Sequence, residues 1–191
     1  MKNILFVFLI SFFSFTIISC SEEEEVKTGL FVSVGKSGTI LTSSDGTTWT
    51  SSNSGTSFQL NGVTRHIGKS TSGKFLAVGN GATVLVSPNA ISWEQFKTLK
   101  KRLWGVTYAN STFITVGNSG RIYTSPDGIL WDDKTNLDVT RKKLREVTYG
   151  NSTFVIAGFS GTILTSSDGT TWTSRTSGTT NNLEDISGPN E

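Results

Sequence analysis

Two runs of basic residues are the strongest candidates for binding chemistry in this 191-residue chain. Each run holds three cations in a row and is followed at once by a leucine, so the runs share one register in two neighbouring units of the chain. Gathered ammonium and guanidinium groups attract anions, and an indole beside them suits a sugar or an acidic polymer. The alternative is a pair of solvated loops inherited by duplication. The candidate ligand-binding residues are Lys97, Lys100, Lys101, Arg102, Trp104, Arg141, Lys142, Lys143 and Arg145.

Residues suited to catalysis or metal binding are scarce. His66 is the single histidine and Cys20 the single cysteine, which leaves too few groups for a histidine-based metal site or a Ser-His-Asp relay. The adjacent acidic pairs at 132–133 and 184–185 would point to opposite faces of a strand, a poor arrangement for acid-base catalysis. We therefore predict no enzyme activity, no catalytic residues, no metal site and no cofactor. With 17 Lys and Arg against 15 Asp and Glu, the overall charge does not favour nucleic acid.

An internal repeat organises the chain. Residues 37–51 and 160–174 are the same fifteen residues, and looser copies occur at 81–93 and 120–131. The tryptophans that end these copies lie 44, 38 and 41 residues apart. A period near 40 with several short alternating strands is typical of propeller blades. In the third unit, for example, alternation and turn residues predict strands at 103–108, 113–117 and 122–125.

The first strand of each unit has a recognisable pattern, in which an aliphatic residue follows a leucine after two other residues. It occurs at 60–63, 103–106, 144–147 and 183–186. The first unit lacks this strand, and the copy at 183–186 has no unit of its own. We therefore predict an all-β fold, a small β-propeller of four repeats of about 41 residues, with the first blade closed by the strand at 183–186. The alternative is an open half-ring that dimerises into an eight-bladed assembly.

The segments at 43–49 and 166–172 resemble Asp-box (BNR-type) repeats. Over residues 30–187 the chain resembles the propellers of the photosystem II stability and assembly factor family and their exported bacterial relatives. The resemblance implies a propeller in which the box residues have structural roles. Two departures are a turn one residue shorter than usual and, in the second unit, Asn89 and Ala90 in place of aspartate and glycine. The structural Asp-box residues are Ser43, Asp45, Gly46, Trp49, Asp127, Gly128, Trp131, Ser166, Asp168, Gly169 and Trp172.

The beginning of the chain resembles a bacterial lipoprotein precursor. Lys2 precedes an apolar run from Ile4 to Ile18, and Cys20 then follows an aliphatic and a small residue, as in a lipobox. Four glutamates come directly after Ser21 and indicate a solvated tether. We expect lipidation of Cys20 and a location at the outer membrane, on the cell surface or the periplasmic face. The expected division is a signal peptide at 1–19, a lipidated acidic tether at 20–29, the propeller domain at 30–187 and a C-terminal tail at 188–191.

Taken together, these features predict a membrane-anchored, exported lipoprotein that acts as a non-enzymatic binding or assembly module. Its expected partners are the membrane, through the lipid, and a protein or an anionic glycan. One alternative is a sialidase-like hydrolase, because sialidases share Asp-boxes. Those enzymes also need an arginine cluster and a tyrosine nucleophile. This chain has only six arginines and three tyrosines from which to build them, which counts against this alternative. Another alternative is an architectural assembly that works only with a larger partner.

Overall fold

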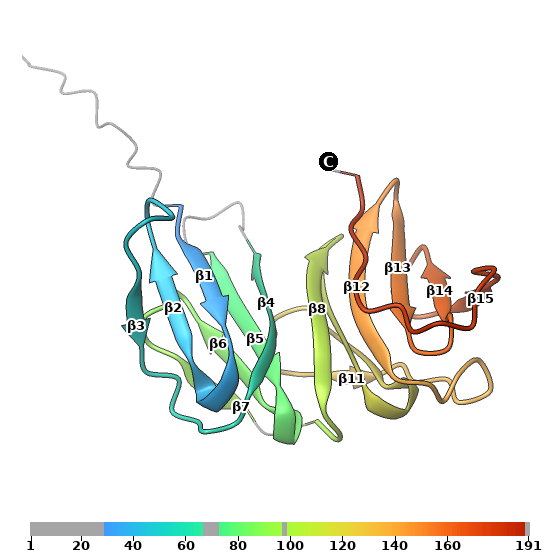
Figure 1. Ribbon diagram of the computed structural model, residues 1–191, viewed down its shortest axis with the longest axis horizontal. Helices are drawn as coiled ribbons and strands as arrows, with labels where there is room; N and C mark the ends of the chain where they lie inside the picture. Colours follow the sequence, from blue (N-terminus) through green and yellow to red (C-terminus); the bar gives the residue numbers. More distant parts are fainter. Residues whose placement is uncertain (1–28, 67–72, 97–98, 190–191) are drawn as a thin grey trace, which may run out of the picture.

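The computed structural model describes residues 29–66, 73–96 and 99–189, which form four antiparallel sheets in chain order (Figure 1). The first sheet has three strands: β1 (Phe31–Val34), β2 (Ile40–Ser43) and β3 (Thr50–Ser52). The second comprises β4 (Leu60–His66), β5 (Lys74–Gly79), β6 (Val84–Ser87) and β7 (Glu94–Phe96). The third comprises β8 (Leu103–Ala109), β9 (Thr112–Gly117), β10 (Ile122–Ser125) and β11 (Asp132–Asp133). The fourth comprises β12 (Leu144–Gly150), β13 (Thr153–Gly158), β14 (Ile163–Ser166) and β15 (Thr173–Arg175). The predicted all-β fold with four propeller-type repeats is confirmed.

In the first three blades, the turns that correspond to the one between β5 and β6 are short 3-10 segments. They are η1 (Lys36–Gly38), η2 (Asn80–Ala82) and η3 (Asn118–Gly120). Gly120 has a φ of 70°, and a Cβ there would lie 2.4 Å from the carbonyl oxygen of Thr140. Only glycine fits here, because the linker from β11 to β12 passes directly against it.

One hydrogen-bond pattern recurs in the turns between the third and fourth strands. In the fourth blade, Oδ1 of Asp168 accepts the backbone N–H groups of Thr170 (2.7 Å) and Thr171 (2.8 Å). These bonds stabilise the ionised carboxylate and lower the pKa of Asp168 well below its usual range. Asn89 makes the same two contacts through its amide oxygen. Ala90 takes the positive φ (59°) that glycine has in the other turns. The substituted second turn therefore keeps the shared geometry.

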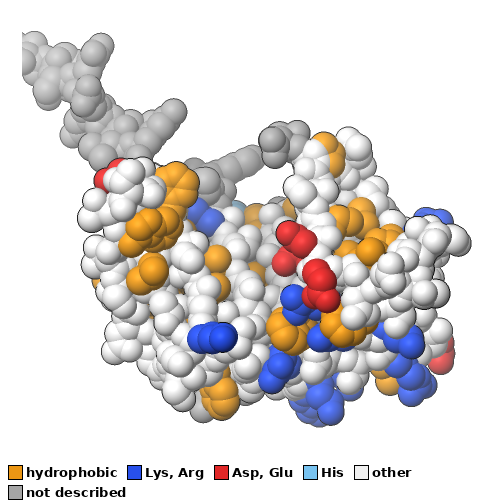
Figure 2. Space-filling view, viewed as in Figure 1, with side chains coloured by type: hydrophobic (Ala, Val, Ile, Leu, Met, Phe, Trp, Pro, Cys, Tyr) orange, Lys and Arg blue, Asp and Glu red, His pale blue; other side chains and the backbone are white. Residues whose placement is uncertain are grey.

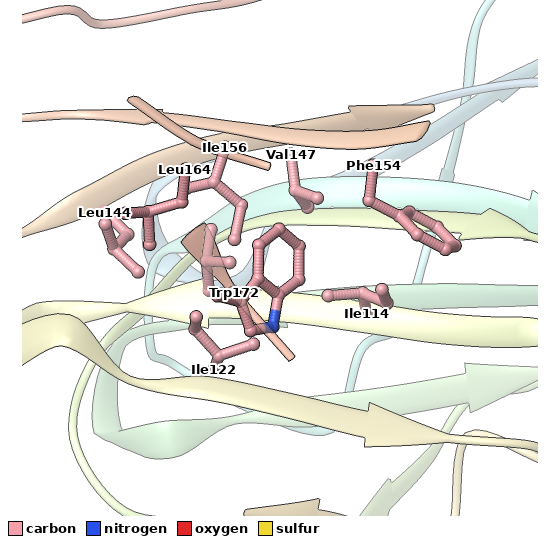
Figure 3. Close-up of a cluster of buried hydrophobic side chains, with 9 residues drawn as sticks. Ile114, Ile122, Leu144, Val147, Phe154, Ile156, Leu164 and Trp172 are labelled. Atoms are coloured by element: carbon pink, nitrogen blue, oxygen red, sulfur yellow. The ribbon is translucent and has the colours of Figure 1, made fainter. Parts of the chain in front are cut away.

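Apolar side chains pack between neighbouring blades, and each such contact joins two faces of different composition (Figure 3). We call the face toward the preceding blade the leading face and the opposite face the trailing face. In the fourth blade the leading face consists of Phe154, Ile156, Leu164 and Trp172. It packs against the trailing face of the third blade, which presents Ile114, Val116 and Ile122. Equivalent clusters join the second blade to the third and the first to the second.

The structure corrects the expected closure of the first blade. Among the described residues β1 pairs only with β2, so the first sheet keeps three strands and β1 forms its edge. The segment at 183–186 lies beside the fourth blade, where the N–H of Leu183 donates to the carbonyl oxygen of Gly158 (3.0 Å). The equivalent bond joins Leu60 to Gly35, so the segment takes the position of a first strand for a following blade.

The reason for the difference lies in the linker. The N–H of Gly161 donates to the carbonyl oxygen of Asn181, and a Cβ on Gly161 would meet the carbonyl oxygen of Thr179. The linker thus follows the same path as those before it and brings residues 183–186 beside the fourth blade, as Figure 1 shows. The open arc agrees with the half-ring alternative, whose dimerisation stays a prediction.

No helix among the described residues is long and apolar enough to cross a membrane. The predicted signal peptide, the lipidation site Cys20 and residues 20–28 of the tether lie outside the described residues.

Candidate functional site

The structure brings four of the candidate ligand-binding residues together where β8 and β12 begin. The ring of Trp104, on β8, has the guanidinium carbon of Arg145 4.2 Å from its centroid and that of Arg102 5.4 Å away. The ammonium nitrogen of Lys143 lies 4.8 Å from the same ring and 3.6 Å from the ring centroid of Phe159. We call these five residues the cation-aromatic cluster. Cations are attracted to ring faces by the quadrupole of the π-system.

Neighbouring strands and turns fix the cluster. The first strands of adjacent blades contact each other, which brings Arg145 of β12 to Trp104 of β8. The indole is held by its own blade, because its Nε1–H donates to Oδ1 of Asn118 at 2.7 Å. The side chains therefore converge although the sequence separates them by about one repeat.

The cluster carries more positive charge than its acidic neighbour balances. Nε of Arg145 lies 2.7 Å from Oε2 of Glu184, an ion pair in which the glutamate side chain remains 55% exposed. The other ion pairs of the described residues involve neither Arg102 nor Lys143. Partial desolvation, followed by repulsion from the Arg145 charge, lowers the pKa of Lys143. A bound anion would relieve this crowding of like charges.

The other candidate cations stand apart from the cluster. Lys100, Lys101, Arg141 and Lys142 are exposed, and two of them contribute only backbone contacts, in which Tyr123 donates to the carbonyl of Lys100 and Gly120 to that of Lys142. Lys97 lies outside the described residues. Figure 2 shows Lys and Arg side chains gathered along the lower part of one face, below a smaller acidic group. The exposed cations therefore widen the field around the cluster without touching the indole.

Sequence reasoning missed Glu146, the residue after Arg145. Burial raises its pKa to about 7, the nearby Asp185 charge adds to the effect, and a hydrogen bond from the N–H of Val147 opposes it. The equivalent positions in the two preceding blades are Gly62 and Gly105. A carboxylate at a position that glycine holds in the two preceding blades was the available signal.

The arrangement gives little support for catalysis. No group of three metal-ligating side chains occurs in residues 29–66, 73–96 and 99–189. Arg102, Arg145 and Glu184 resemble an arginine-carboxylate site, but Tyr149 lies near the opposite end of β12 from Arg145. His66 packs against Tyr108, with ring centroids 3.9 Å apart.

No protein-family model matches the sequence, and no curated protein matches it. Two similar solved structures are described as YCF48 bound to D1 peptide and as YCF48 from Cyanidioschyzon merolae. The first is 20% identical with a TM-score of 0.59, covering 77% of this chain and 50% of its own. The second is 20% identical with a TM-score of 0.58, covering 76% and 52%. The chain thus spans about half the length of either structure, and the likeness supports the propeller fold predicted from the family resemblance.

Proposed function

We propose that this protein is an exported, lipid-anchored binding module without enzyme activity, whose ligand is an acidic segment of a partner protein. The observation that carries the proposal is the cation-aromatic cluster, in which three cations surround one indole and only Arg145 has an ion-pair partner among the described residues. Lipidation of Cys20 and export rest on the sequence pattern of the first 25 residues.

Carboxylates suit the cluster better than neutral sugars do. A guanidinium binds a carboxylate through two parallel hydrogen bonds, and such charged bonds are the stronger ones in proteins. With three cations already within 5.4 Å of the ring centroid, less of the Trp104 indole is free to stack on a sugar. Glu184 is a carboxylate of the chain itself that already pairs with Arg145, so it shows the chemistry that the site accepts.

The comparison supports a peptide ligand. One of the two similar structures is described as bound to a D1 peptide, so a propeller of this fold binds a peptide segment. The two chains are only 20% identical, so the likeness suggests the class of ligand and not the residues that bind it.

The test is the binding of the full chain to a fluorescent hexaglutamate peptide, compared with a heparin oligosaccharide. We expect Arg102→Gln and Lys143→Gln each to weaken peptide binding by about tenfold, the loss of one charge-assisted hydrogen bond. Lys36→Gln is the control, because Lys36 is an exposed cation that occupies in the first blade the position of Phe159 in the fourth. An equal loss of peptide affinity in all three variants would show that net charge, and not the cluster, determines binding. Binding of heparin alone would favour the anionic glycan, and hydrolysis of a sialoside by the chain would contradict a non-enzymatic role.

Anchoring needs its own test. A lipidated chain partitions with the membrane, whereas Cys20→Ser leaves it unacylated. Protease treatment of intact cells then separates the two predicted faces: degradation indicates the cell surface, and protection indicates the periplasmic side. A chain that carries no lipid at Cys20 would refute the anchor while leaving the binding proposal to its own assay.

A further inference from the structure

Among the residues that the structure describes, the leading face of the first blade stays exposed. Phe31 of β1 lies opposite Ser43, as Phe154 of β13 lies opposite Ser166, so the two phenylalanines are equivalent. Phe154 is 1% exposed, whereas Phe31 is 57% exposed. The tryptophans at 49 and 172 also come from identical sequence, and they are 42% and 6% exposed. The first blade therefore presents to solvent a phenylalanine position that every later blade buries against its predecessor, and a tryptophan position that the fourth blade buries.

The trailing face of the fourth blade is the complementary surface. Its side chains are Val155, Ala157, Ile163 and Thr165, by equivalence with the third-blade residues that pack under Trp172. Ile163 is half-buried, whereas its counterparts Ile40 and Ile122 are fully buried beneath a following blade. Among the described residues the arc thus ends in an exposed leading face and a partly covered trailing face, the two kinds of surface that meet in each internal contact.

Strand pairing is incomplete at the same two places. The first sheet lacks a first strand, so β1 is an edge within the described residues. Residues 183–186 have the pattern and the position of a first strand, yet they belong to none of the described sheets. Leu183 is half-buried, whereas its equivalents Leu60, Leu103 and Leu144 are nearly fully buried. The exposed leading face therefore lies beside a sheet that lacks its first strand, and the trailing face of the fourth blade lies beside a first strand that has no sheet.

End repeats of repeat proteins normally carry a polar outer face, which keeps the array soluble. Here the first blade keeps Phe31 and Trp49 instead, with no charged residue replacing either. Exposed apolar residues next to an unpaired strand edge mark a site of association. The leading face of the first blade has the composition of those that pack against a preceding blade. A partner that covers it must therefore have a trailing face and a first strand.

We propose that this partner is a second copy of the chain. The segment at 183–186 of each copy pairs with β1 of the other, and the fourth blade of each copy packs against the first blade of the other. Two such contacts close a ring of eight blades, within the usual four to eight of propellers. The matched part of this chain covers about half of either similar solved structure, so two such parts make up about the length of one such propeller.

The internal blades fix the register of the new pairing. Leu144 lies opposite Gly158 and Val147 opposite Ile156, with a bulge between them. By equivalence, Leu183 of one copy lies opposite Gly35 of the other, and Ile186 lies opposite Ser33. This inference rests on the blade ends alone and is independent of the ligand at the cation-aromatic cluster.

The first test is the mass of the full chain released from detergent, measured by native mass spectrometry at micromolar concentration. We expect a dimer. Phe31→Asp should raise the dissociation constant by at least about tenfold, because it places a charge in the apolar contact. The matched control is Leu130→Asp, at a side chain that is 71% exposed and lies on neither of these two faces, and it should stay dimeric. A monomeric parent chain, or equal dissociation of both variants, overturns the proposal.

The second test distinguishes a second copy from closure within one chain. Chains carrying Ser33→Cys and chains carrying Ile186→Cys are mixed and oxidised, and the parent chain is oxidised in parallel to correct for Cys20. We expect a disulfide-linked pair that joins one chain of each kind. If the double variant instead forms the bond within a single, monomeric chain, the ring closes on itself with four blades and the proposal is wrong. A dimer in which neither mixture forms the bond associates through another surface and also overturns it.

Discussion

Glu146→Gln should stabilise the protein at neutral pH and have little effect at acid pH. Glu146 is partly buried between the inner strands, where its Oε1 accepts the N–H of Val147 at 3.0 Å. Burial and the Asp185 charge raise its pKa from the ordinary 4.5 to about 7. Glutamine keeps the oxygen acceptor but has no charge to bury.

The size and sign of the effect follow from the pKa. Between pH 4.5 and 7 the folded chain holds a proton that the unfolded chain has released, so the free energy of unfolding falls as pH rises through this window. The full pKa difference corresponds to about 3 kcal/mol, an upper value because the side chain keeps some contact with water. Below pH 4.5 the carboxyl is neutral in both states, and the glutamine variant should match the parent.

Urea denaturation at pH 4 and pH 8, followed by tryptophan fluorescence, measures this difference. We expect the gain from Glu146→Gln to grow by about 2 to 3 kcal/mol between the two pH values. Glu94→Gln, at an exposed position on β7, should show no such growth. A gain that is the same at both pH values would refute the reasoning, because it would arise from packing and not from the buried charge.

Three further predictions concern the turns, the blade contacts and the charge near Glu146. Phe154→Ala should lower the free energy of unfolding by about 3 to 5 kcal/mol, whereas the equivalent Phe31→Ala should cost less than about 1 kcal/mol in chains dilute enough to be monomeric; urea midpoints measure both. Asp168→Asn should lower the urea midpoint at pH 7 but reduce the loss of stability on acidification. Because the pKa of Asp168 is lowered in the folded chain, its carboxylate stabilises the fold above about pH 4, and this stabilisation is lost as pH falls through the pKa of the folded state. Asp185→Asn should move the pH midpoint of the Glu146 effect downward, since the Asp185 charge helps to raise that pKa; the same pair of denaturation series, repeated at intermediate pH, would show it.

The blades could be predicted from the sequence because their determinants are local. In the third blade the predicted strands at 103–108, 113–117 and 122–125 match β8, β9 and β10 to within one residue. Alternation sets which side chains face the neighbouring blades, and the turn residues set where each strand ends. The residues that set each strand and turn lie close together in the chain, so the local sequence pattern is enough to predict them.

Closure could not be predicted in the same way. Whether residues 183–186 reach β1 depends on the rotation between successive blades, which accumulates over every contact in the arc. That rotation is set by the volumes packed between blades and by linker paths such as the one at 177–183, and no local pattern encodes it. A missing strand and a surplus strand in one chain predict pairing, but they do not say whether the pair forms within one copy or between two.

The candidate site was predicted in part for a related reason. The shared register identified the correct linkers, yet only Arg102 and Lys143, with Trp104 and Arg145, converge on one indole. Lys101, the residue before Arg102, has a φ of 72°, so the linker backbone helps to decide which cation reaches the indole. Phe159 completes the cluster from the turn after β13, and no motif in the sequence around it links it to the basic runs.

The identical segments at 37–51 and 160–174 separate what local sequence determines from what position in the array determines. In both, the box aspartate accepts the same two N–H groups, so the turn geometry is a local property. Trp49 nevertheless donates to the carbonyl of Gly46 at 3.3 Å and stays exposed, whereas Trp172 turns between two blades and has no hydrogen-bond partner. A buried indole N–H without a partner is costly, so the packing between blades must outweigh that loss. Trp49 does not make this packing contact in the single chain, and it would gain the same stabilisation if another trailing face covered the first blade.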